Sequence, residues 1–431
     1  MDEEAGIRVL GLRPQQPVIL RAATEDDGRR HWRSEGHFLA DESGTVDAAA
    51  RDSHGGTYRG VSPMGLFWSM KLADAHADGH TTFAKAGASP NRVSLEIECD
   101  GRIAASAELK RNFLAPGTEI RDLKIGESFS GNGHGRESGH VARLFIPPGG
   151  EPHPVVIVLS GSGGGFDLDK AAVLSRHGFA TLALAYFGIP PLPAWLHRIP
   201  LDYFEAALAW LMTHPELDLQ RIGALGVSRG AELALLLGTK FPQLRAIVAY
   251  APSSVAWAAG GRDKATGEII PSWTWRGEPV PFAPLPLRSF MLRLAVPVAV
   301  ARRPVMFRNL FRAGLRNRKA AALAAIPVEQ IRGPIMLVSG GDDHVWPTTE
   351  MCKAILARLA DHHFPHTVEH RNYPHAGHML RYPFLPTTSR QSRNSHLRNA
   401  RFSFGGTALD DAEANADSWR RAIAFLHASL R

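Results

Sequence analysis

The 431-residue chain has few cysteines and no long apolar run, and both absences limit what it can be. Cys99 and Cys352 lie far apart and form no Cys-x-x-Cys pair, so we expect no disulfide framework and a reducing compartment. Arginines and prolines interrupt the nearest approach to a membrane span, which starts at Met291, so no stable membrane insertion is expected. The N-terminus lacks the apolar segment of a secretory signal, and the C-terminal HASLR is not a peroxisomal address. We therefore expect a cytoplasmic protein that is a monomer or a small homo-oligomer.

Signals for nucleic acids, metals and nucleotide cofactors are also missing. The net charge of +7 would suit an anionic small molecule, an acidic surface or a nucleic acid, but no DNA-reading motif or aromatic and basic ladder accompanies it. His375 and His378 have the spacing of metal ligands, but no cysteine or carboxylate nearby completes a site. The glycines of 161–165 are not followed by the Gly-Lys-Ser/Thr of a Walker A loop, and Phe166 stands where a dinucleotide motif needs its third glycine. We predict no nucleic-acid partner, no metal and no cofactor.

Two patterns of hydrophobic residues indicate two domains. Residues 1–125 contain short, partly alternating runs between turn residues, which predicts a small antiparallel β-sandwich. Residues 126–139 are rich in glycine and serine and are expected to form a linker. In residues 140–431, near-continuous apolar runs alternate with helix-like stretches, which predicts an α/β domain with a mostly parallel sheet flanked by helices. A lid-like insertion is expected at about 256–330, where positions 281–320 hold nine lysines and arginines and no acidic residue.

The most informative motif is Gly226-Val227-Ser228-Arg229-Gly230. It follows a buried strand and precedes an alanine- and leucine-rich helix, which is the setting of a nucleophile elbow. Glycines two positions to either side of the serine remove side chains that would clash in such a sharp turn. The motif predicts Ser228 as the nucleophile, and the Arg229 backbone N–H, at the helix N-terminus, as an oxyanion donor.

A serine nucleophile needs a base, and the base needs an orienting acid, which in this fold follow the serine in the order acid, histidine. The acid is expected in PIMLVSGGDDHVWP, where the spacing from Gly340 selects Asp343. The base is expected in VEHRNYPHAGHM, where the small residues Ala376 and Gly377 before His378 allow the loop to bend over the elbow. Asp342 and His344 are interpreted as solvated loop or supporting residues, and His378 is chosen over His375.

The second oxyanion donor is expected in the loop after the third strand of the sheet. That loop is Gly161-Ser162-Gly163-Gly164-Gly165, in which small residues allow backbone N–H groups to approach a bound carbonyl. We predict Ser162 as the donor, with Gly163 as the next candidate.

With these residues placed, the sequence resembles one known family, which comprises the type I acyl-CoA thioesterases and the bile acid–CoA:amino acid N-acyltransferases. The resemblance covers both domains and is carried by GVSPMGLFWSM, GSGGGFDLDKAAVLSRHGFATLALAYF, GALGVSRGAELAL, YPHAGH and DDAEANADSWRRAIAFL. It implies an N-terminal β-sandwich, an α/β-hydrolase domain, and a triad of Ser228, Asp343 and His378. In this family the transferases have cysteine as the nucleophile, so Ser228 favours hydrolysis of an acyl-CoA substrate over transfer to an amino acid.

Substrate recognition transfers least well, because residues 256–326 match the family poorly and are expected to line the acyl pocket. The CoA phosphates need cations, and the acid-free insertion offers Arg302, Arg303, Arg308 and Arg312, besides Arg229 at the elbow. These arginines could equally coat a helical lid or touch a membrane surface. Two other activities stay open: N-acyl transfer to an amino acid, and a CoA-independent carboxylesterase or dienelactone-type hydrolase activity.

Overall fold

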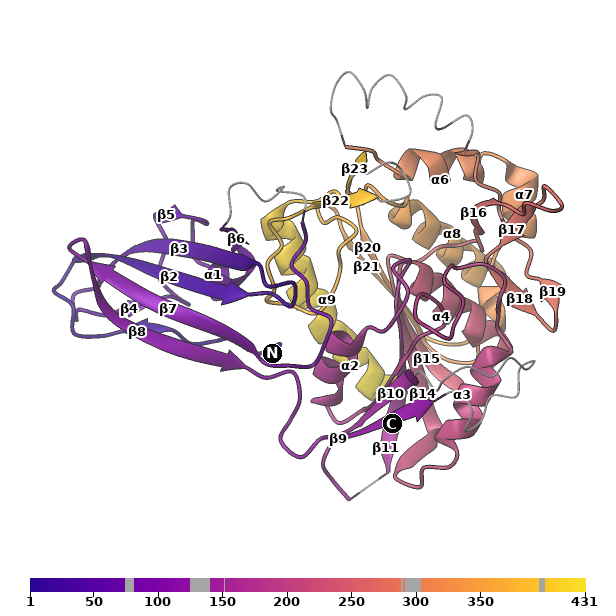
Figure 1. Cartoon of the computed structure of the whole chain (residues 1–431), viewed down its shortest axis with the longest axis horizontal. Coiled ribbons are helices and arrows are strands. Elements are labelled where there is room, and N and C mark those ends of the chain that lie inside the picture. Colours follow the sequence, from indigo (N-terminus) through magenta and orange to yellow (C-terminus); the bar gives the residue numbers. More distant parts are fainter. Residues whose placement is uncertain (74–80, 125–139, 151, 288–289, 291–303, 395–399) are drawn as a thin grey trace.

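A computed structural model describes residues 1–73, 81–124, 140–150, 152–287, 290, 304–394 and 400–431 (Figure 1). Within this part of the chain, no helix is both long and apolar enough to cross a bilayer. The expected linker, residues 126–139, lies outside the described residues.

The N-terminal part is built on an antiparallel sheet with the strand order β5-β3-β2-β7-β8, in which β6 also pairs with β3. Alternation along β2 and β3 buries one face, including Leu20, Trp32 and Phe38, and leaves polar side chains on the other. The short strands β1 and β4 form a separate two-stranded sheet, and Val46 of β4 lies in the same apolar cluster. The elements are β1 (Arg8–Val9), β2 (Pro17–Glu25), β3 (His31–Leu39), β4 (Val46–Asp47), β5 (Gly55–Gly56), α1 (Gly65–Trp68), β6 (Lys71–Leu72), β7 (Asn91–Cys99) and β8 (Arg102–Arg111).

The C-terminal part contains an eight-stranded sheet in the order β21-β20-β15-β14-β11-β12-β10-β9. Strands β11, β12, β14, β15, β20 and β21 are parallel to one another, whereas β10 pairs antiparallel with both β12 and β9. The apolar runs at 140–146, 153–159, 180–184, 217–227, 244–250 and 335–340 all form strands of this sheet, which is therefore mostly parallel, as predicted. Its strands are β9 (Glu119–Lys124), β10 (His140–Ile146), β11 (His153–Leu159), β12 (Ala180–Leu184), β14 (Leu217–Val227), β15 (Leu244–Tyr250), β20 (Ile335–Gly340) and β21 (Val368–Tyr373).

Strand β9 belongs to a different sheet from the one that its place in the sequence predicted. Strand β9 falls within the stretch 1–125, yet it joins the large sheet as the antiparallel neighbour of β10. Strands β9 and β10 are therefore neighbours in one sheet. The short EIRDLK segment of β9 mixes polar and apolar residues as an edge strand does, so its pattern resembles the strands before it more than the buried strands after it.

Helices cover both faces of the large sheet (Figure 1). α2 (Leu168–Ser175) and α9 (Ala408–Ser429) pack on one face, in an apolar cluster that continues into the core of the N-terminal part. α3 (Tyr203–Leu211), α4 (Arg229–Lys240) and α8 (Thr348–Asp361) pack on the other face. The N-terminal part is thus joined to the sheet through α2 and α9, as the figure also shows.

The described residues of the insertion form small sheets and two helices beside the C-terminal ends of the parallel strands (Figure 1). β18 joins a three-stranded sheet with β13 and β19, and β16 pairs with β17. The elements are β13 (Ile199–Pro200), β16 (Ala258–Arg262), β17 (Ile269–Pro271), β18 (Trp273–Trp275), β19 (Glu278–Pro279), α6 (Arg308–Leu315), α7 (Arg318–Leu323), a 3₁₀ turn (Val328–Gln330), and the later pair β22 (Gln391–Asn394) and β23 (Ala400–Ser403).

Candidate active site

Ser228 occupies the turn between β14 and α4, with φ 56° and ψ −118°. A positive φ is unfavourable for a residue with a Cβ, so the surrounding contacts must hold this conformation. The Ser228 N–H donates to the Tyr250 carbonyl at 2.8 Å, and the Ser228 carbonyl accepts from two N–H groups in the first turn of α4. The serine is therefore fixed at the C-terminal edge of the sheet, where a nucleophile elbow places it.

The two glycines of the motif make this turn possible by close backbone contact. A Cβ on Gly226 would lie 2.1 Å from the Gly230 oxygen, and a Cβ on Gly230 would lie 2.3 Å from the Ser160 oxygen. Both distances are far inside van der Waals contact, and the atoms met are backbone. The elbow thus packs directly on the end of β11, as the G-x-S-x-G pattern predicts.

The structure brings the predicted serine, histidine and acid together from three separate loops. His378 Nε2 lies 3.1 Å from Ser228 Oγ, and His378 Nδ1 lies 2.8 Å from Asp343 Oδ2. The three residues are 6%, 7% and 1% exposed, so the chain of hydrogen bonds is shielded from bulk water. These loops follow β14, β20 and β21, whose parallel C-terminal ends meet at one edge of the sheet.

Asp343 is held by its own loop. Its Oδ1 accepts the backbone N–H groups of Val345 and Trp346 at 2.7 and 2.9 Å, while Oδ2 accepts the Thr348 hydroxyl at 3.1 Å as well as the imidazole. These donors fix both carboxylate oxygens, so the acid can orient the imidazole ring.

The neighbouring candidates lie away from the serine. His375 is exposed, while Asp342 accepts from the Gly406 N–H at 3.0 Å and lies 3.0 Å from the imidazole of His344. Their positions agree with surface and supporting roles. Within the described residues, no three His, Cys, Asp or Glu side chains gather as a metal-binding group.

The glycine-rich loop after β11 lies beside the elbow. A Cβ on Gly161 would lie 3.3 Å from the Val227 oxygen and 3.6 Å from Ser228 Cβ. Ser162 and Gly163 follow at once and are exposed at the edge of the site. The Tyr186 hydroxyl donates to the Ser160 carbonyl at 2.6 Å and anchors the start of this loop. The loop is therefore close enough to the serine to supply a backbone donor.

The side chain of Arg229 points into the protein interior, where it binds a carboxylate. Its guanidinium donates to Glu232 Oε2 at 2.7 Å, to the Trp257 carbonyl at 3.3 Å and to the Ser272 hydroxyl, and it lies 5.6 Å above the Trp273 ring. The guanidinium is thus buried, and the contribution that fits a substrate site is the Arg229 backbone N–H. The sequence did not suggest Glu232, although an acidic residue within the apolar run of a buried helix was a usable signal.

Glu232 links the elbow to the insertion. It is fully buried, and its Oε1 accepts from Trp273 Nε1 at 2.7 Å and from the Trp257 backbone N–H at 3.1 Å. Burial raises the pKa of Glu232, while the Arg229 charge and these donors lower it. One carboxylate therefore fixes two tryptophans of the insertion against α4, the helix that begins directly after Ser228.

A row of aromatic rings leads from the imidazole into the insertion. The Trp346 ring lies 6.2 Å from the His378 ring, Phe311 lies 5.5 Å from Trp346, and Trp257 lies 4.9 Å from Phe311. Gly314 of α6 allows this approach, because a Cβ there would meet the Trp257 ring at 2.7 Å. These rings form an apolar wall next to the histidine, and we call Trp257, Phe311 and Trp346 the aromatic wall.

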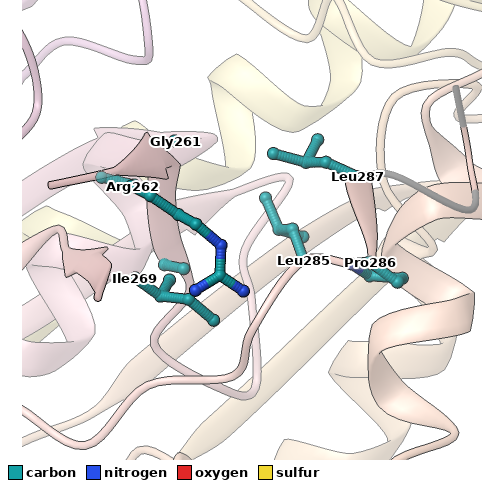
Figure 2. Close-up of a pocket in the computed structure, with 8 residues that line it drawn as sticks. Gly261, Arg262, Ile269, Leu285, Pro286 and Leu287 are labelled. Carbon is teal, nitrogen blue, oxygen red and sulfur yellow. The ribbon is translucent and has the colours of Figure 1, made fainter. Parts of the chain in front are cut away.

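A pocket of about 420 Å³ lies further along the insertion (Figure 2). Figure 2 shows Arg262 and Ile269 of the β16–β17 hairpin facing Leu285 across the hollow. Leu285 also packs against the cluster that contains the aromatic wall. No residue lining this pocket belongs to the Ser228, His378 and Asp343 group, so it is an outer feature of the insertion. The pocket is lined by Ala258, Ala259, Gly261, Arg262, Ile269, Leu285, Pro286 and Leu287.

Of the four insertion arginines expected to meet CoA phosphates, the structure describes two. Arg312 binds Glu350 of α8 through Nε at 2.9 Å, and Arg308 lies 3.9 Å from Asp342. Each therefore has an acidic partner from another segment of the chain, which the absence of acidic residues within 281–320 could not reveal. Arg302 and Arg303 lie outside the described residues.

The strand order and the order of the site residues define the class of protein. In chain order within the large sheet, the serine follows the fifth strand, the acid the seventh and the histidine the eighth, and the serine lies on a strained elbow. This arrangement is that of an α/β-hydrolase.

Comparison with known families gives a narrower assignment. Residues 199–431 match the family model "BAAT / Acyl-CoA thioester hydrolase C terminal", and residues 2–125 match "Acyl-CoA thioester hydrolase/BAAT N-terminal region". The chain belongs to this family and is an enzyme of the hydrolase class.

Relatives at about 30% identity extend over almost the whole chain. A mouse "Peroxisomal succinyl-coenzyme A thioesterase" is 30% identical over 98% of this chain and 93% of its own length. A mouse "Acyl-coenzyme A thioesterase 2, mitochondrial" is 32% identical over 100% of this chain and 87% of its own. Among solved structures, a putative dienelactone hydrolase from Klebsiella pneumoniae is 17% identical, with a TM-score of 0.42 over 72% of this chain and 99% of that one.

Proposed function

We propose that this enzyme hydrolyses an acyl-CoA to a free acid and CoA through an acyl-serine intermediate on Ser228. The observation that carries the proposal is the 3.1 Å separation of Ser228 Oγ and His378 Nε2 on a strained elbow, in a chain of this family. Hydrolysis of an acyl-CoA agrees with the names of the two mouse relatives.

In the first half of the reaction, His378 acts as the general base. With its Nδ1–H donated to Asp343, Nε2 takes the Ser228 proton as Oγ attacks the thioester carbonyl. The tetrahedral oxyanion is stabilised by the backbone N–H groups of Arg229 and Ser162, with Gly163 as the neighbouring donor. Collapse breaks the C–S bond, and the imidazolium returns its proton to the CoA thiolate.

In the second half, water replaces CoA. His378 removes a proton from the water, which attacks the ester carbonyl, and the Ser228 oxygen leaves with the proton from the imidazolium. We assign the acyl group to the aromatic wall, because it is apolar and adjoins the imidazole. The CoA phosphates are assigned to the basic insertion. The candidates are Arg308 and Arg312, and also Arg302 and Arg303, which precede them in the sequence.

The test measures CoA thiol release from short-, medium- and long-chain acyl-CoAs by wild type and Ser228→Ala, with products identified by mass spectrometry. We expect a free acid from the wild type and no release by the variant. An amide product in the presence of glycine or taurine would instead identify an N-acyltransferase. Turnover of simple esters without any CoA release would identify a CoA-independent esterase.

We also propose that the protein is cytoplasmic and that it is a monomer or a small homo-oligomer. Since one mouse relative is named peroxisomal and another mitochondrial, cell fractionation with an antibody to the untagged chain is the direct test of place. Light scattering of the purified protein measures its oligomeric state.

A further inference from the structure

The loop that carries His378 lies against the first turns of α9. The Gly377 N–H donates to Asp411 Oδ1 at 2.7 Å, and the Arg381 N–H donates to Asn415 Oδ1 at 2.8 Å. Asp411 and Asn415 are four residues apart and therefore share one face of the helix. The two hydrogen bonds bracket His378 on either side in the chain.

The fit around these bonds leaves little freedom. Asp411 and Asn415 are each 2% exposed, and the His378 N–H donates to the Phe404 carbonyl at 2.9 Å. A Cβ on Gly406 would lie 2.4 Å from Asp411 Oδ1, and a Cβ on Gly377 would lie 2.7 Å from the Gly405 backbone. The backbone before the imidazole is thus confined between α9 and the 404–406 segment.

We propose that Asp411 is a positioning residue, which with Asn415 holds the His378 backbone so that Nε2 reaches Ser228 Oγ. This inference rests on the proposed function, in which His378 is the base. An ionised carboxylate makes a stronger hydrogen bond to an N–H than a neutral oxygen does, so the hold on the loop depends on the charge of Asp411.

That charge changes near neutral pH. Burial raises the pKa of Asp411 to about 7, against the Gly377 N–H and the charge of Arg390, which lower it. Asp410 of the same helix and Asp342 of the acid loop raise it further. Other charged or titratable groups around this site are Arg381, which lines a small cavity with Asp411, and Arg308 and His344, both next to Asp342.

The experiment compares Asp411→Asn and Asp411→Ala with the control Glu413→Gln, which makes the same carboxylate-to-amide change two residues later in α9, at an exposed position. At pH 8.5 we expect kcat of Asp411→Asn to be about three- to tenfold below wild type with KM unchanged, because the acceptor has lost its charge. At pH 6, where wild-type Asp411 is also neutral, the two kcat values should converge. Asp411→Ala should be less active than wild type at both pH values, and the control should follow wild type.

Reactivity of Ser228 toward a fluorophosphonate gives a second readout that needs no acyl-CoA. Slower labelling of folded Asp411→Ala, with folding checked by circular dichroism, supports the positioning role even if the wild type releases no CoA. A wild type that releases no CoA would refute the proposed function alone. The inference would be overturned if Asp411→Ala were labelled as fast as wild type and had the same kcat. It would also be overturned if the ratio of the wild-type kcat to the Asp411→Asn kcat were the same at both pH values.

Discussion

Replacing Glu232 by glutamine should destabilise the protein strongly, because the change leaves the Arg229 guanidinium buried without its counter-charge. Glu232 is 0% exposed and Arg229 is 6% exposed, so water cannot replace the lost partner. Removing one member of a buried ion pair typically costs about 3–5 kcal/mol. Glutamine keeps an oxygen for Trp273 Nε1, and Arg229 keeps the Ser272 hydroxyl and the Trp257 carbonyl, so we expect about 3 kcal/mol, the lower end of that range.

The assay is urea denaturation at pH 8 followed by tryptophan fluorescence, since two of the affected residues are tryptophans. The matched control is Glu350→Gln, which breaks the Arg312 pair at a site where the two side chains are 40% and 51% exposed. An exposed pair contributes about 0–1 kcal/mol, so this variant should unfold close to wild type.

A compensating change separates the loss of charge balance from the loss of packing. Arg229→Met added to Glu232→Gln removes the unpaired charge, and it should recover about half of the lost stability. A cost below about 1 kcal/mol for Glu232→Gln, or a double variant less stable than the single one, would refute the argument that this pair acts through buried charge.

Three further predictions concern the site directly. Asp343→Asn should lower kcat by about 10³- to 10⁴-fold with the fold retained, as in established Ser-His-Asp triads, because asparagine favours the wrong imidazole tautomer; thiol release measures it. Gly230→Ala should cost about 1–3 kcal/mol and most of the activity, since its Cβ meets backbone oxygens at 2.3 and 2.4 Å; thermal unfolding and fluorophosphonate labelling measure these effects. Phe311→Ala should shift kcat/KM toward bulkier acyl groups by about tenfold relative to Leu323→Ala, a truncation on the exposed face of α7; an unchanged acyl-chain profile would remove Phe311 from the acyl site.

The Ser228, Asp343 and His378 group could be predicted because each residue lies in a short loop that follows an apolar strand. Parallel strands bring their C-terminal ends to one edge of the sheet. The order of the strands and the shortness of the loops were therefore enough to predict that the three loops meet. Gly226 and Gly230 also pointed to Ser228, because the sharp turn at this serine leaves no room for a Cβ at either position.

The partners of the supporting carboxylates could not be predicted, because they are far away in the sequence. Glu232 binds donors 25 and 41 residues later, and Asp411 binds a donor 34 residues earlier. Asp411 also stands within the acidic start of a helix, where carboxylates usually face solvent. The basic insertion posed the same difficulty, since Arg312 meets Glu350 across 38 residues.

Two of the three loops that carry the proposed catalytic residues are held by a buried carboxylate that accepts backbone N–H groups, and a third such carboxylate lies in the first turn of α4, just after Ser228. Glu232 accepts from Trp257, Asp343 accepts from Val345 and Trp346, and Asp411 accepts from Gly377. Each carboxylate is at least 98% shielded from solvent, so each carries a desolvation cost that apolar packing would avoid.

Burying these carboxylates lowers stability, but it fixes the positions of the backbone segments that they bind, as is common at functional sites. Because burial raises the pKa of Asp411 above its unfolded value, the folded state holds its proton more tightly, and stability falls as the pH rises from about 4 to about 7. The ionised form that weakens the fold is also the form that binds the Gly377 N–H most strongly. The protein is therefore expected to gain precision at His378 over the same pH range in which Asp411 costs it stability.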